Sequence, residues 1–267
     1  MKFSCTPLRY AHSVRKLRYL RLSGIAMALP ARNQEAINNH LAHTEFLELL
    51  VEDELNRRRH RLFARRLKQA HIPEVKTPEN FDWSFKPKLP KALILDLATA
   101  RFVTEHAGAL FLGPPGTGKT HIAVALAVAA IQAGYTVLYV SAFDLAQDVA
   151  EAQATGTRKD LIGRLTRTDL LVLEDLGMRR LPASAAEDLL EVFVRHYEKG
   201  SIIVTSNCPL EDWGKLLGDT AAAGAILDRF PHHAEIIKLE RRSYRMHDRR
   251  ELHRVNAERP ALTADTE

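Results

Sequence analysis

From residue 91 onward, short runs of consecutive hydrophobic residues alternate with longer segments of helical pattern. The runs cover residues 109–112, 136–141, 169–174 and 201–206, and each is apolar over most of its length. Strands that are buried on both faces of a parallel sheet show this pattern. Helices are expected around them, at about 90–105, 119–133, 143–154, 158–166 and 184–198. The alternation predicts an α/β fold of three layers, in which helices cover both faces of a parallel sheet.

The first 70 residues follow a different pattern, in which apolar and basic positions recur at helical spacing. We expect an amphipathic helix over 12–29, ending near Pro30, and a longer helix over about 43–69. At ~100° per residue, one face of the longer helix is basic. The opposite face carries Leu55, Leu62, Phe63 and Leu67. The pattern predicts a small, all-helical, basic N-terminal domain.

A proline-rich stretch, residues 71–90, separates these two regions. It has no helical period, so we interpret it as a linker. The predicted organisation is a helical domain at 1–70, the linker at 71–90, an α/β domain at 91–246 and a basic tail at 247–267.

The composition is that of a globular protein with one sizeable core, since 46% of the 267 residues are hydrophobic and 27% are charged. The two cysteines, Cys5 and Cys208, have no metal-ligand or disulfide-framework spacing, which favours a reducing compartment. No apolar run approaches the ~20 residues that span a bilayer, and the N-terminus lacks the apolar segment of a secretion signal. We therefore expect a cytoplasmic protein without a membrane partner.

Positive charge is concentrated near the N-terminus. Residues 1–70 contain 14 Lys and Arg against 6 Asp and Glu, whereas residues 71–267 contain 24 against 27. Such an excess indicates a polyanionic partner, nucleic acid before membrane, and a helical stripe of arginines would contact the phosphates of a nucleic acid with little dependence on base sequence. A solvated surface face is the alternative. The candidate DNA-binding residues are Arg15, Lys16, Arg18, Arg21, Arg57, Arg58, Arg61, Arg65 and Lys68.

A glycine-rich turn at residues 110–120, Leu-Phe-Leu-Gly-Pro-Pro-Gly-Thr-Gly-Lys-Thr, joins a predicted strand to a helix. The G-x-x-x-x-G-K-[ST] pattern in this context is typical of a phosphate-binding loop, whose main-chain N–H groups and helix N-terminus surround an anion. We expect Lys119 to reach the β- and γ-phosphates of ATP, and the Thr120 hydroxyl to bind Mg²⁺. The predicted ATP-binding residues are Gly113, Pro114, Pro115, Gly116, Thr117, Gly118, Lys119 and Thr120.

Candidate catalytic residues follow two of the predicted strands. Glu174 and Asp175 come at the end of the run 169–174, and Asn207 follows the run 201–206. Parallel sheets gather their ligands at the carboxyl ends of the strands, so these side chains are expected near the loop. Glu174 would bind Mg²⁺, Asp175 would polarise the attacking water, and Asn207 would orient that water or the γ-phosphate.

Three aromatic side chains alternate within the linker, at Phe81, Trp83 and Phe85. Either they pack the linker onto the surface of the α/β domain, or one of them lines the adenine pocket. We favour packing.

The order of these motifs resembles the IstB family of AAA+ ATPases, the accessory ATP-binding proteins of insertion-sequence transposition. The resemblance covers nearly the whole chain and extends in part to the DnaC-type helicase loaders. It rests on GPPGTGKT (113–120), LVLEDLG (171–177), IVTSN (203–207), AILDRF (225–230) and SYR (243–245). It implies a P-loop AAA+ domain of the ASCE class, with Asn207 as sensor 1. It also implies that Arg229 is the arginine finger offered to a neighbouring subunit and that Arg245 is the sensor-2 arginine.

One departure from the family pattern concerns the catalytic carboxylates. The family usually has Asp followed by Glu at this strand end, whereas here Glu174 precedes Asp175. Asp175 is one methylene shorter than the usual base, and a shift of ~1 Å in a catalytic group can cost ~10²-fold in rate. We therefore expect slow hydrolysis with intact ATP binding.

The resemblance implies an ATPase that forms homo-oligomers on duplex DNA through ATP at subunit interfaces and assists a transposase. The alternative is a DnaC-like loader whose N-terminal helices grip a replicative helicase. A P-loop kinase is disfavoured, because no substrate-binding insert is evident and Arg229 would have no purpose.

Overall fold

The computed structural model describes residues 7–86, 88–178, 183–197, 199–217 and 220–240. The chain divides into two compact units, residues 1–65 and 66–267, and each is described by itself. Arg245 and the tail at 247–267 lie outside the described residues.

Unit 1 is helical. It contains α1 (Pro7–Tyr19), α2 (Ser23–Asn39) and most of α3 (His43–Gln69), which continues into unit 2. The prediction of one helix over 12–29 is wrong, because the chain breaks between α1 and α2, where Arg21 has a left-handed φ of 59°. The expected stop near Pro30 is also wrong, since α2 runs through this proline. The helix expected at 43–69 matches α3.

The carboxylate of Glu54 explains where α2 begins. Its Oε2 accepts hydrogen bonds from the N–H groups of Gly24 (2.6 Å) and Ile25 (3.3 Å), and its Oε1 accepts one from Nε of Arg58 (2.7 Å). The first N–H groups of a helix have no partner within it, so a carboxylate there stabilises the helix start. Because this cap comes from another helix, 30 residues further along the chain, the local sequence does not reveal it.

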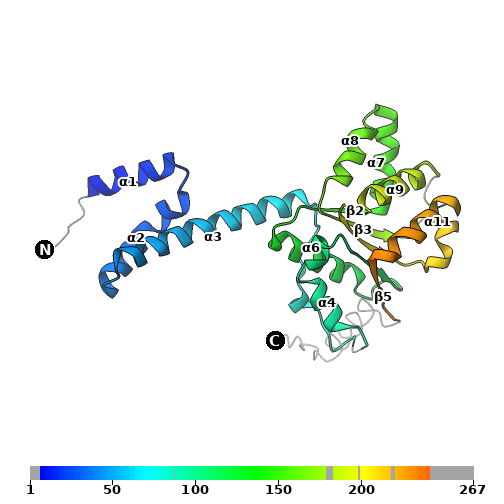
Figure 1. Ribbon diagram of the computed structural model, residues 1–267, viewed down its shortest axis with the longest axis horizontal. Helices are drawn as coiled ribbons and strands as arrows, with labels where there is room; N and C mark the ends of the chain where they lie inside the picture. The colour runs from blue at the N-terminus through cyan, green and yellow to red at the C-terminus, as the bar shows by residue number, and fades with distance from the viewer. Residues whose placement is uncertain (1–6, 87, 179–182, 198, 218–219, 241–267) are drawn as a thin grey trace, which may run out of the picture. The chain divides into compact units, whose positions relative to one another are not determined.

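Unit 2 is built on a parallel sheet (Figure 1). Its strands are β1 (Gly108–Leu112), β2 (Val137–Ser141), β3 (Leu170–Leu176), β4 (Ser201–Ser206) and β5 (Ala234–Lys238). They lie in the order β2-β3-β4-β1-β5, and each neighbouring pair is parallel. The first four confirm the predicted strands. β5 is not predicted from the sequence, because Ala-Glu-Ile-Ile-Lys is short and contains two charged residues.

Helices cover both faces of this sheet, which confirms the expected three layers (Figure 1). They are α4 (Lys91–Leu97), α5 (Arg101–Thr104), α6 (Lys119–Ala133), α7 (Ala142–Thr155), α8 (Arg158–Thr166), α9 (Ala183–His196), α10 (Trp213–Leu217) and α11 (Thr220–Arg229), with single 3₁₀ turns at Pro78–Asn80, Leu210–Asp212 and Phe230–His233. The single helix expected at 90–105 is instead α4 and α5. The break follows Thr99, whose hydroxyl bonds the carbonyl of Asp96 and competes with the helix, and Ala100 is left-handed at φ 59°.

Alternate residues of the strands face opposite layers. Leu110, Leu171 and Val204 belong to the buried cluster shared with α7, α8, α9 and α11. The intervening positions, including Phe111, Val172 and Ile203, are fully buried on the other face, where α6 contacts four of the strands. The core therefore fixes the start of α6 against the ends of β1, β3 and β4.

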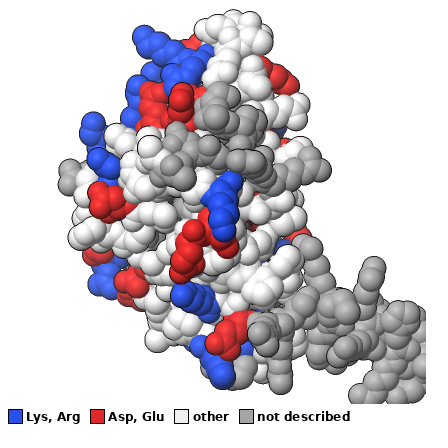
Figure 2. All heavy atoms as spheres, turned by 90° about the vertical axis from the view of Figure 1, so that its right-hand side faces the viewer, with Lys and Arg blue, Asp and Glu red and all other residues white. Residues whose placement is uncertain are grey.

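Charges of both signs are interspersed on the face of unit 2 that Figure 2 turns toward the viewer. In the same unit, Arg158 on α8 is ion-paired with Asp188 and with Glu191 (2.5 Å) on α9. None of the helices in the described part of the chain has the length and hydrophobicity needed to cross a membrane.

Candidate nucleotide-binding site

The predicted phosphate-binding loop connects the end of β1 to the start of α6. Gly118 precedes α6 with a left-handed φ of 98°, a conformation that other residues rarely adopt. A Cβ at this position would also lie 2.9 Å from the ring of Phe81. The hydroxyl of Thr117 donates to the carbonyl of Pro114 (2.8 Å) and closes the loop on itself. The loop therefore has the tight backbone that an anion-binding turn requires.

The ammonium group of Lys119 is held inside this loop. Its Nζ donates to the carbonyls of Gly113 (2.7 Å) and Pro114 (3.0 Å) and to Oδ1 of Asn207 (2.6 Å). Lys119 is 4% exposed. These contacts hold the ammonium group at the loop, in a position where it can interact with an anionic ligand.

The two candidate carboxylates at the end of β3 differ in position. Pairing with β4 is irregular between Leu173 and Leu176, and Asp175 has a left-handed φ of 56°. The N–H of Asp175 donates to the hydroxyl of Thr205 (2.9 Å) on β4. Asp175 thus lines the cleft described below, whereas Glu174 is 4% exposed and in register with Ser141 on β2.

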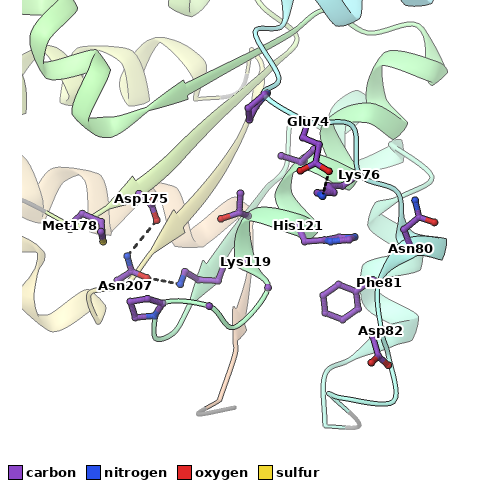
Figure 3. Close-up of a pocket in the computed structure, with 16 residues that line it drawn as sticks. Glu74, Lys76, Asn80, Phe81, Asp82, Lys119, His121, Asp175, Met178 and Asn207 are labelled. Carbon is purple, nitrogen blue, oxygen red and sulfur yellow. Dashed lines mark hydrogen bonds and ion pairs between the residues drawn. The ribbon is translucent and has the colours of Figure 1, made fainter. Parts of the chain in front are cut away.

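Asn207 joins the loop to the carboxylate. Its Oδ1 accepts from Lys119, and its Nδ2 lies 3.4 Å from Oδ1 of Asp175, as the dashed lines of Figure 3 show. Lys119 begins α6 after the loop that follows β1, Asn207 directly follows β4, and Asp175 lies near the end of β3; these three strands are adjacent in the sheet. The structure therefore brings together the loop, Asn207 and Asp175, as the sequence predicts.

A cleft of about 560 Å³ opens in front of these side chains. Lys119, Asp175 and Asn207 line one side (Figure 3), and Thr120 also belongs to the lining. Five linker residues line the other side: Glu74, Lys76, Asn80, Phe81 and Asp82. Pro73 of the linker also belongs to the lining. The sequence alone does not single out these residues as part of the site, except that Phe81 is one of the three linker aromatics, for which packing is the favoured role. Of the three linker aromatics, Phe81 both packs and faces the cleft. It is 7% exposed and stands edge-to-face against His121 of α6, with ring centres 5.2 Å apart.

Comparison with known proteins identifies the family. A family model described as IstB-like ATP binding protein matches residues 15–252. The chain belongs to the IstB-like family. It is 35% identical over 231 residues to a protein of Pseudomonas aeruginosa named as the ATP-binding protein of insertion sequence IS21, covering 86% of this chain and 87% of that one. It is 32% identical over 231 residues to the corresponding protein of insertion sequence IS5376 from Geobacillus stearothermophilus, covering 86% and 92%.

Two solved structures are similar in fold to this IstB-like protein. AMPPCP-bound DnaA from Aquifex aeolicus has a TM-score of 0.53 and 23% identity, covering 72% of this chain and 58% of that one. DnaI has a TM-score of 0.51 and 20% identity, covering 63% and 89%. At these identities the likeness shows the fold alone.

Arg229 of the IstB-like protein lies away from the cleft. It ends α11, and its NH1 donates to the carbonyl of Ala225 (3.1 Å) in the preceding turn. It lines a separate small cavity with Phe230 and His233. Within one chain, the structure therefore does not bring Arg229 to the loop.

The predicted DNA-binding side chains of the IstB-like protein lie on α1, in the turn that follows α1, and on α3. All are exposed except Arg57, which is half-buried. Arg58 is ion-paired with Glu54 (2.7 Å), so part of its charge is neutralised within the unit. Arg61, Arg65 and Lys68 repeat at helical spacing on one exposed face of α3.

Proposed function

We propose that this IstB-like protein is an ATPase that uses ATP and Mg²⁺ to assemble on duplex DNA and assists the transposase of the same insertion sequence. The observation that carries the proposal is the convergence of Lys119, Asn207 and Asp175 on one cleft at the end of a phosphate-binding loop. The ATP-binding proteins of insertion sequences IS21 and IS5376 are its relatives over most of the chain.

The phosphates of ATP fit the loop 113–120. Main-chain N–H groups and the N-terminus of α6 favour a polyanion there, and Lys119 adds a charge that is already positioned. In this arrangement the base would extend toward Phe81 of the linker and His121 and Val124 of α6, which offer an aromatic and apolar surface in the same cleft.

The side chains near Lys119 also fit Mg²⁺, which prefers hard oxygen ligands. We propose the Thr120 hydroxyl and Glu174 as ligands. Glu174 would act through a bridging water, because Asp175 is the carboxylate that lines the cleft. When bound, Mg²⁺ would neutralise charge on the β- and γ-phosphates.

Hydrolysis would use Asp175 and Asn207. Asp175 accepts a proton from the attacking water, and the Asn207 amide, fixed between Lys119 and Asp175, orients the γ-phosphate. The short Asp175 side chain makes this step slow, so ATP would act mainly as a switch for assembly.

Assembly would complete the site. Arg229 lies outside the cleft of its own chain, so a neighbouring subunit would supply it as a finger that stabilises charge on the transferred phosphoryl group. A ligand that binds only at a completed interface favours the assembled state. The sensor-2 role of Arg245 and the cytoplasmic location stay predictions.

The experiment is to measure the mass of the protein in solution with and without ATP, Mg²⁺ and duplex DNA. We expect larger assemblies only when ATP and Mg²⁺ are present, and none with Lys119→Ala. If the parent binds no ATP, the proposal fails. Duplex affinity that does not depend on salt, together with binding to a replicative helicase, would instead support the helicase-loader hypothesis.

A further inference from the structure

The segment that lines the far side of the nucleotide cleft is the direct continuation of helix α3. This helix ends at Gln69, and the chain turns at His71, whose φ is 56°. Ala70, between them, is fully buried, and its carbonyl accepts from the N–H of Tyr139 on the edge strand β2 (2.8 Å). The end of α3 is therefore fixed to the sheet by a main-chain hydrogen bond.

Seven residues further on, the same segment is attached to helix α6 just after the phosphate-binding loop. Nε2 of His121 lies 3.2 Å from the carbonyl oxygen of Thr77. A carbonyl can only accept, so Nε2 carries the proton and donates. This bond holds the turn at Pro78–Asn80 against the first turn of α6.

Phe81 makes a second attachment, to the loop itself. Its ring edge lies 2.9 Å from the position that a Cβ on Gly118 would occupy. Trp83 stands edge-to-face against it, with ring centres 4.9 Å apart, and donates from Nε1 to the carbonyl of Pro78 (3.0 Å). These contacts make residues 77–83 a folded strap rather than a free linker.

A ligand that fills the cleft would touch both the loop and the strap, because Lys119 lines it on one side and Asn80, Phe81 and Asp82 line it on the other (Figure 3). Its binding free energy therefore depends on where the strap lies. A ligand shifts a conformational equilibrium by its differential affinity for the two states.

We propose that the strap, residues 77–83, couples ATP binding to duplex DNA binding through helix α3, and that His121 and Phe81 are the positioning residues that carry this coupling. The inference rests on the proposed function, since it takes ATP as the ligand of the cleft and the basic face of α3 as the DNA contact. Thermodynamic linkage requires the effect to be reciprocal. Bound duplex raises the affinity for ATP by the same factor by which ATP raises the affinity for duplex.

The experiment measures the dissociation constant of Mg²⁺–ATP for the full chain with and without a saturating short duplex, and that of the duplex with and without ATP. For the parent we expect the same coupling factor in both directions, about 5- to 150-fold. His121→Leu removes the donor and Phe81→Leu removes the ring, and each should bring the factor to about one while both ligands still bind at higher concentration.

Two variants serve as matched controls. In His121→Gln the side-chain amide can still donate to the Thr77 carbonyl, so most of the coupling should be retained. Val75→Ala alters an exposed linker side chain, 47% accessible, outside the cleft and should keep the full factor. If the substitutions only impaired folding, the affinities for ATP and for duplex would both fall, and His121→Gln and His121→Leu would have the same effect.

Trp83 gives an independent measurement. Its emission should change when ATP is added to the parent, and Trp83→Phe should remove that change. If the parent binds both ligands with a coupling factor of one, the inference about the strap is wrong while the proposed function still holds. The same conclusion follows if both leucine variants keep the coupling factor of the parent. A parent that binds no ATP or no duplex overturns the proposed function and, with it, this inference.

Discussion

Nζ of Lys119 and Oδ1 of Asn207 lie 2.6 Å apart, although the two residues are separated by 88 positions in the chain. Lys119 begins α6, after the loop that follows β1, and Asn207 directly follows β4, the strand next to β1. The contact orients the Asn207 amide, because its oxygen faces the lysine and its nitrogen must then face Asp175.

Replacing Asn207 by aspartate tests this orientation with an almost identical shape. The new carboxylate would lie against Lys119 and beside Asp175, so it would neutralise the lysine and repel the phosphates. We expect the dissociation constant of ATP to rise about 10- to 100-fold, measured by fluorescence titration. Asn207→Ser removes the amide without adding charge and should cost about tenfold or less in affinity. If Asn207→Asp and Asn207→Ser lost the same amount of ATP affinity, the added negative charge would not be the cause of the loss.

Lengthening the side chain at position 175 by one methylene should speed ATP hydrolysis. In Asp175→Glu we expect phosphate release per subunit to rise, by up to ~10²-fold, because the carboxylate reaches further into the cleft. Residue 175 is left-handed at φ 56°, which glutamate tolerates less well than aspartate, so the variant should also lose ~1 kcal/mol of stability. Asp175→Asn should bind ATP without turnover. If Asp175→Glu binds ATP but hydrolyses it no faster than the parent does, the length of the Asp175 side chain does not explain slow hydrolysis.

Mixing two inactive variants tests whether Arg229 acts in a neighbouring subunit. Arg229→Ala and Lys119→Ala should each lose most ATPase activity. A mixture contains interfaces where an intact Lys119 site faces an intact Arg229, so part of the activity should return. Phosphate release at constant total protein measures this. A mixture as inactive as its components would argue against a site shared between subunits.

Charge reversal on α3 tests the contact with duplex DNA. Arg61 and Arg65 are exposed, so reversing both removes phosphate contacts without disturbing the Glu54–Arg58 pair. We expect weaker duplex binding at every salt concentration, and a slope of log affinity against log salt reduced by ~0.9 for each lost contact. Arg164→Glu reverses an exposed arginine in unit 2 and is the control. Unchanged duplex affinity in the α3 variant would exclude this face as the DNA contact.

Lowering the pH should destabilise unit 1, because it protonates Glu54. Burial raises the pKa of this carboxyl group, but the bonds from Arg58, Gly24 and Ile25 outweigh it, so the pKa lies below its ordinary value of 4.5. The ionised group therefore stabilises the unit above that value, and the stabilisation is lost as the pH falls through the lowered pKa. Helix content measured by circular dichroism should fall in this range. Glu54→Gln should cost ~1.5–3 kcal/mol at neutral pH and weaken the acid transition.

Much of the sheet and half of the site can be predicted from the sequence. The strands that carry Glu174 and precede Asn207 are largely continuous apolar runs, and the glycine-rich loop has a fixed spacing, so local residues determine both. The start of α2 is not predictable in this way, because its cap, Glu54, lies on another helix. The wall of the cleft made by residues 73–82 cannot be predicted from the sequence for a similar reason. Its position depends on Phe81 and Thr77 meeting Gly118 and His121, which only the tertiary fold brings near.

The place of β4 between β1 and β3 has a consequence for how such a protein can evolve. Asn207, which directly follows this middle strand, contacts both Lys119 and Asp175, the residues that we propose to hold the triphosphate and to activate water. Under that proposal, a substitution at position 207 would alter retention of the nucleotide and its rate of consumption together. Natural variation that adjusts one without the other would have to arise elsewhere, for example at the linker.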